Sequence, residues 1–180
     1  WEIDTLLMSC RVIGRHVETA LLAFLAEQVR AGGGKRLRGW FIPTGKNELV
    51  RDLSDMKEYA SKRNMQVVDA RPAARFEGRE AEPRPGLRQG HIPGSRNVPS
   101  SMVLNADGTL KPKAELEAIF KAAGIDPSKP VVATCGSGVT AAILALSLAV
   151  IGQTNVPIYD GAWAEWGQDN GLPVETGPAA

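Results

Sequence analysis

The 180-residue sequence is poor in the side chains that build metal centres and disulfide frameworks. It contains two cysteines, Cys10 and Cys135, and two histidines, His16 and His91. These residues allow at most one disulfide, and their spacing matches no standard arrangement of zinc ligands. We therefore expect neither a disulfide scaffold nor a metal site.

An excess of charge of either sign is also missing. Lys and Arg total 21 against 20 for Asp and Glu, which leaves a formal net charge of +1. Such a balance gives no electrostatic reason to expect nucleic acid or an anionic membrane as a partner. The longest apolar stretches, residues 141–151 and 20–26, are too short to span a bilayer, and the first residues do not have the basic-then-apolar pattern expected of a signal peptide. The sequence thus predicts a soluble, cytoplasmic protein.

Apolar residues make up 43% of the chain, enough for a sizeable core, and they occur in alternating patterns. The predicted strands cover residues 66–69, 131–134 and 156–159. The predicted helices cover residues 49–60, 113–123 and 139–151. Residues 70–97 are irregular, and a loop of that length is more often functional than not. Strand–helix alternation of this kind predicts an α/β fold with a parallel sheet.

The most specific chemical signal follows the predicted strand 131–134. Cys135 is succeeded by Gly136, Ser137 and Gly138, and a helix begins at once. Small residues let consecutive backbone N–H groups turn toward a sulfur anion, and the helix N-terminus adds partial positive charge. Both effects favour a nucleophilic thiolate over a buried structural cysteine, which is the alternative. No arginine stands about five residues later, which argues against a phosphate substrate.

Six motifs occur in order around this loop. They are Val-Asp-Ala-Arg at 68–71, Arg-Phe-Glu-Gly at 75–78, Glu-Pro-Arg at 82–84, Gly-His-Ile-Pro-Gly at 90–94, Cys-Gly-Ser-Gly-Val-Thr at 135–140 and Tyr-Asp-Gly-Ala-Trp at 159–163. With these motifs, residues 49–177 resemble the C-terminal, catalytic rhodanese domain of the 3-mercaptopyruvate sulfurtransferases. The resemblance implies a three-layer rhodanese-like fold and sulfur transfer from 3-mercaptopyruvate through a cysteine persulfide. The implied acceptors are cyanide or a thiol such as thioredoxin, and no cofactor is implied.

The resemblance also implies roles for single residues. Cys135 corresponds to the nucleophile, and Ser137 to a serine that polarises the thiol or relays a proton, although a helix-start cap is equally plausible. Arg75 and Arg84 match the arginines that hold the donor carboxylate, and guanidinium groups grip carboxylates bidentately. Taken alone, each arginine reads as a solvated loop charge. The loop residues expected to line the substrate site are Gly136, Gly138, Val139 and Thr140. The residues expected to support the site are Asp69, which organises the loops, and the structural residues His91, Trp163 and Trp166.

Residues 1–48 do not resemble a rhodanese domain. Predicted strands at 3–8 and 37–42 flank a helical pattern at 17–29, and the turn at 11–15 resembles part of the acyltransferase-like module of FkbH-like enzymes. The favoured interpretation is a strand–helix–strand extension that adds edge strands to the sheet. The related enzymes are normally tandems of two rhodanese domains, so we expect slower turnover from this chain. Two alternatives stay open, a non-catalytic persulfide carrier and a degenerate acyl-CoA or acyl-carrier binding fragment.

Overall fold

The computed structural model describes residues 27, 30, 31, 33, 49–169 and 171–179. The chain divides into two compact units, Trp1–Thr44 and Gly45–Ala180, and the second holds the elements described below. The strands predicted at 3–8 and 37–42 and the turn at 11–15 lie outside the described residues, as does most of the helix predicted at 17–29.

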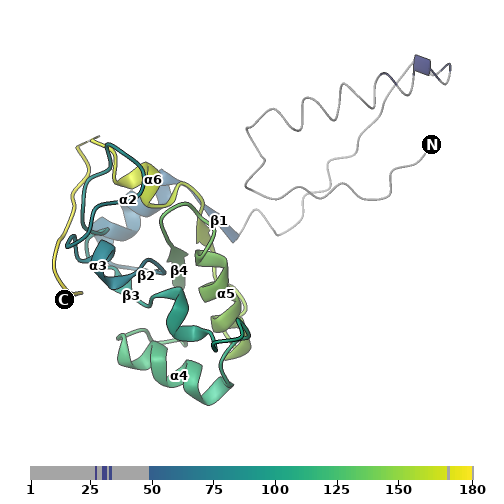
Figure 1. The fold of residues 1–180 in the computed structure, drawn as a ribbon, viewed down its shortest axis with the longest axis vertical. Helices are drawn as coiled ribbons and strands as arrows, with labels where there is room; N and C mark the ends of the chain where they lie inside the picture. Colours follow the sequence, from purple (N-terminus) through teal and green to yellow (C-terminus); the bar gives the residue numbers. More distant parts are fainter. Residues whose placement is uncertain (1–26, 28–29, 32, 34–48, 170, 180) are drawn as a thin grey trace. The chain divides into compact units, whose positions relative to one another are not determined.

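A five-stranded sheet with the order β1-β5-β4-β2-β3 forms the centre of the second unit (Figure 1). The strands are β1 Val50–Arg51, β2 Gln66–Asp69, β3 Arg96–Asn97, β4 Val131–Thr134 and β5 Ile158–Tyr159. All neighbouring pairs are parallel, and the register sets Asp69 of β2 beside Thr134 of β4. Because the carboxyl ends of parallel strands meet at one edge, the residues that follow Asp69 and Thr134 emerge close together.

Helices cover both faces of this sheet. They are α2 Leu53–Lys62, α3 Ala73–Phe76, the 3-10 helix η2 Ser100–Val103, α4 Lys113–Ala122, α5 Ala141–Val150 and α6 Ala162–Trp166. On one face, α4, α5 and η2 pack on Val131 and Ala133, whereas on the other face α2 and α6 pack on Val132. This alternation along β4 produces the predicted three-layer rhodanese-like fold. No helix among the described residues is long and apolar enough to cross a membrane.

Two predicted helices start later than expected. The helix predicted from residue 49 begins at Leu53, because the Asp52 side chain accepts a hydrogen bond from the Asp55 N–H at 3.0 Å and caps it there. Val50–Arg51 pair with β5 instead, so the apolar spacing was misleading at this end. The helix predicted from residue 139 begins at Ala141, which leaves Val139 and Thr140 in the Cys135 loop. The stretch 70–97, predicted to be irregular, contains the short elements α3 and β3.

Candidate active site

Cys135 directly follows β4, the central strand of the sheet. The residue is 1% exposed, packs in the apolar cluster beneath α5, and its thiol forms no disulfide. Its carbonyl accepts a hydrogen bond from the Trp163 N–H at 2.8 Å, and the Gly136 carbonyl accepts one from the Ala164 N–H at 3.1 Å. The start of α6 therefore holds the backbone of the Cys135 loop in place.

The backbone N–H groups of this loop, residues 135–140, differ from its carbonyls in having few hydrogen-bond partners. The N–H groups of residues 136–140 donate to no acceptor within the part of the chain that the structure describes. Amide donors with partners begin at Ala142, whose N–H donates to the Val139 carbonyl at 3.3 Å, and the Ile143 N–H donates to the Thr140 carbonyl at 3.1 Å. Consecutive uncommitted donors beside a cysteine, together with the positive end of α5, form an arrangement that stabilises an anion.

Glycine is required at Gly138. Its φ angle is +78°, in the left-handed region that side chains rarely adopt, and a Cβ there would lie 3.2 Å from the Asp160 carbonyl oxygen. The other predicted loop residues are more accessible: Ser137 is exposed, and Gly136, Val139 and Thr140 are half-buried. The Thr134 hydroxyl, one residue before Cys135, is buried and finds no hydrogen-bond partner among the described residues.

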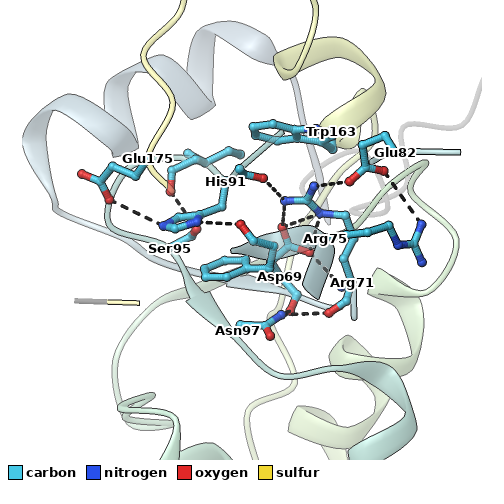
Figure 2. A network of polar contacts seen from close by, with 12 residues as sticks. Asp69, Arg71, Arg75, Glu82, His91, Ser95, Asn97, Trp163 and Glu175 are labelled. Atoms are coloured by element: carbon cyan, nitrogen blue, oxygen red, sulfur yellow. Dashed lines mark hydrogen bonds and ion pairs between the residues drawn. The ribbon is translucent and has the colours of Figure 1, made fainter. Parts of the chain in front are cut away.

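A buried network of charges is centred on Arg71 (Figure 2). The Arg71 side chain is 1% exposed, and its Nε and Nη2 atoms donate to Asp69 Oδ2 at 3.0 and 2.7 Å. Its Nη1 donates to Glu82 Oε1 at 2.7 Å, and its Nη2 also donates to the Gly90 carbonyl at 2.9 Å. Burial alone would lower the pKa of Arg71, but the Asp69 and Glu82 carboxylates more than offset this effect and raise it. Arg71 therefore stays charged.

The Arg71 side chain also connects the network to the Cys135 loop. The Arg71 guanidinium carbon lies 4.4 Å from the centre of the Trp163 ring. The backbone N–H of Trp163 in turn donates to the Cys135 carbonyl. The Cδ atom of Arg71 would be 3.9 Å from a Cβ built on Gly136. Arg71 thus packs against both the Cys135 loop and the residue that holds it.

The two arginines expected to bind a carboxylate differ in their surroundings. Arg75 lies on α3 with its side chain 24% exposed, and its Nη1 is 3.8 Å from Glu82 Oε2. Arg84 is exposed two residues beyond Glu82 and forms no ion pair with any described residue. The structure therefore brings Arg75, but not Arg84, into the buried network. Sequence reasoning had singled out Asp69 and missed Arg71 and Glu82, although an Asp-x-Arg pair directly after a strand was a usable signal.

His91 has the contacts of a structural residue, as expected. Its Nδ1 lies 2.9 Å from the Phe76 carbonyl oxygen, and its ring stacks on the Phe76 ring at 3.8 Å. Burial lowers the pKa of His91, although the Phe76 carbonyl and Glu175 oppose the shift, so the ring is neutral at pH 7. Trp163 and Trp166 are each 1% exposed and belong to the apolar cluster on the α2 and α6 face.

Two surface hollows among the described residues lie away from the Cys135 loop. One hollow lies between the end of α4 and Ile151, and a second lies against β3 and the C-terminal residues Pro178 and Ala179. Neither of these two hollows is lined by a residue of the Cys135 loop. Among the described residues, no three His, Cys, Asp or Glu side chains are grouped so that they could hold a metal ion.

The sequence is similar to several curated sulfurtransferases. It is 49% identical over 128 residues to the 3-mercaptopyruvate sulfurtransferase of Escherichia coli K12, which covers 71% of this chain and 45% of that protein. It is 47% identical over 118 residues to the 3-mercaptopyruvate sulfurtransferase of Homo sapiens, which covers 66% of this chain and 40% of that protein. The chain thus spans less than half the length of these relatives.

Solved structures and family membership agree with this similarity. The structure of SseA from Escherichia coli, a 3-mercaptopyruvate sulfotransferase, matches 73% of this chain and 48% of its own, with a TM-score of 0.58 and 42% identity. Tum1 from Saccharomyces cerevisiae matches 75% of this chain and 48% of its own, with a TM-score of 0.68 and 31% identity. The comparisons do not support the acyltransferase-like resemblance of residues 1–48. Residues 52–169 match the rhodanese-like domain, and the chain belongs to that family.

Proposed function

We propose that this chain is the catalytic domain of a sulfurtransferase that takes sulfur from 3-mercaptopyruvate onto Cys135 and passes it to a thiol or to cyanide. The observation that carries the proposal is the Cys135 loop, in which the N–H groups of residues 136–140 have no acceptor among the described residues. The names of the relatives from Escherichia coli and Homo sapiens support this choice of donor.

In the first step, the Cys135 thiolate attacks the sulfur of 3-mercaptopyruvate. A bond forms between the two sulfur atoms, and the carbon–sulfur bond of the donor breaks with its electron pair passing to carbon. The product is the enolate of pyruvate, which takes up one proton and leaves as pyruvate. The outer sulfur remains on Cys135 as a persulfide, and the N–H groups of residues 136–140 stabilise its anionic form.

In the second step, an acceptor thiolate attacks the outer sulfur of the persulfide. The sulfur–sulfur bond breaks, its electron pair returns to Cys135 as the thiolate, and the acceptor leaves as a persulfide. Cyanide attacks in the same way and leaves as thiocyanate. Cys135 is 1% exposed, so we expect the acceptor to reach the sulfur with a small group or an extended chain end.

The remaining roles follow from the position of each residue. Arg75, partly exposed beside the network, binds the donor carboxylate, and Arg84 is its second ligand on the strength of the resemblance. Ser137, exposed on the loop, transfers the proton to the leaving enolate. The loop residues Gly136, Gly138, Val139 and Thr140 line the donor-binding site. We also propose residues 49–177 as the limits of the rhodanese domain, thioredoxin as one thiol acceptor, and a cytoplasmic location.

Mass spectrometry of the protein after incubation with 3-mercaptopyruvate tests this proposal. We expect one added sulfur on the peptide containing Cys135, its removal by a thiol or cyanide, and one pyruvate for each cycle. Cys135→Ser is the control, because the hydroxyl has nearly the same volume and leaves the loop backbone unchanged. Absence of the added sulfur would refute the proposal. A persulfide that no acceptor removes would favour the carrier instead.

A further inference from the structure

The Glu82 carboxylate has an unusual position, because its two oxygens face two different arginines (Figure 2). Its side chain is 3% exposed. Oε1 accepts the hydrogen bond from Arg71 Nη1 at 2.7 Å, and Oε2 lies 3.8 Å from Arg75 Nη1. Glu82 is therefore a buried anion between a buried cation and a partly exposed one.

The charge of Arg71 is already balanced without Glu82. Asp69, 1% exposed, receives hydrogen bonds from both Nε and Nη2 of Arg71. The formal charges of Asp69 and Arg71 cancel, so Glu82 supplies the surplus negative charge of the network. Arg75 is the group that neutralises this surplus, and with it the four formal charges sum to zero.

We infer that Glu82 determines which sulfur donor the site accepts, by offsetting the positive charge of Arg75. The inference rests on the proposed function, in which Arg75 holds the donor. A singly charged carboxylate can still replace the loose contact between Arg75 and Glu82 with two short hydrogen bonds. A doubly charged donor such as thiosulfate gains the same hydrogen bonds, but its repulsion from the Glu82 carboxylate is twice as large.

Removing the Glu82 charge should therefore raise the rate constant of persulfide formation with thiosulfate more than that with 3-mercaptopyruvate. A neighbouring unit charge changes the binding of a monovalent ion at a partly exposed site by a factor of roughly three to ten. For a dianion the free-energy effect is twice as large, so the factor is squared, whereas for a monoanion it applies once. The ratio of the rate constant with thiosulfate to that with 3-mercaptopyruvate is therefore expected to shift by one such factor. Any loss of Arg75 orientation affects both donors and largely cancels in the ratio.

The experiment measures the second-order rate constant of persulfide formation on Cys135 in a single turnover, with each donor separately. Both reactions give the same Cys135 persulfide, with pyruvate leaving in one case and sulfite in the other. Glu82→Gln keeps an oxygen that accepts from Arg71, whereas Glu82→Asp keeps the charge and shortens the side chain. Glu80→Gln is the matched control, because Glu80 is an exposed carboxylate two residues earlier.

We expect Glu82→Gln to raise the thiosulfate-to-mercaptopyruvate ratio by roughly three- to tenfold, and Glu82→Asp and Glu80→Gln to leave it near the wild-type value. A ratio unchanged in folded Glu82→Gln would overturn the inference and leave Glu82 with a structural role. If Glu82→Gln does not fold, Arg75→Gln decides, since loss of that cation must lower the ratio. A wild-type chain that forms no persulfide with either donor refutes the proposed function itself.

Discussion

Replacement of Arg71 by methionine tests whether the buried network stabilises the fold. Methionine fills a similar volume but leaves Asp69, 1% exposed, and Glu82, 3% exposed, without their shared cation. Breaking a buried ion pair by removing one partner typically costs about 3–5 kcal/mol. A domain of this size has a total stability of roughly 5–15 kcal/mol, so we expect a large fraction of it to be lost.

Urea unfolding at pH 7, followed by circular dichroism, gives the free energy of unfolding of Arg71→Met and its control. Arg79→Met is the control, because the Arg79 side chain is 62% exposed and pairs with Glu77 at the surface, where such pairs contribute about 0–1 kcal/mol. We expect Arg71→Lys to fall between them, since lysine keeps the charge but loses the fork that binds Asp69 and Glu82. Equal stabilities of Arg71→Met and Arg79→Met would refute the reasoning.

Three further predictions concern single residues near the loop and its supports. Thr134→Val removes a buried hydroxyl that has no partner among the described residues, so the free energy of unfolding should rise by about 1 kcal/mol, and a fall of that size would contradict this. Gly138→Ala places a Cβ at a φ of +78°, 3.2 Å from the Asp160 carbonyl oxygen. We expect it to lower the free energy of unfolding by about 1–3 kcal/mol and to slow persulfide formation. An unchanged rate would contradict this expectation. Burial lowers the pKa of His91 below 6.5, so the unfolded chain binds that proton first, and the stability due to neutral His91 is present above pH 6.5 and lost as the pH falls. In urea titrations from pH 7.5 to 5.5, wild type should therefore lose more stability than His91→Asn, and parallel curves would refute this.

Local sequence signals were sufficient for the class of fold and for the prediction that Cys135 is the nucleophile. The β-branched run 131–134 is buried along its whole length, as expected of a central parallel strand, and the pattern at 113–123 forms α4 almost as predicted. The signal for the Cys135 loop is local, because β4, the six-residue loop 135–140 and α5 are consecutive in the sequence. The predicted start of α2 was wrong because the apolar repeat extends back to Leu49, whereas the helix begins after the N-cap Asp52, which forms a capping box with Asp55.

Only the tertiary structure decided how the loop is supported and which charges are shared. The Trp163 N–H that binds the Cys135 carbonyl comes from a helix 28 positions away, and no local pattern specifies that contact. Glu82 lies 11 residues from Arg71, in a loop whose irregular sequence predicts exposed charge rather than a carboxylate 3% exposed. Burial of a charge depends on which distant groups surround it, because only a close partner offsets its loss of water. The sequence alone therefore determined the strand, loop and helix that present Cys135, while folding determined that Arg71 is fixed as a buried support and that Arg75 stays partly exposed.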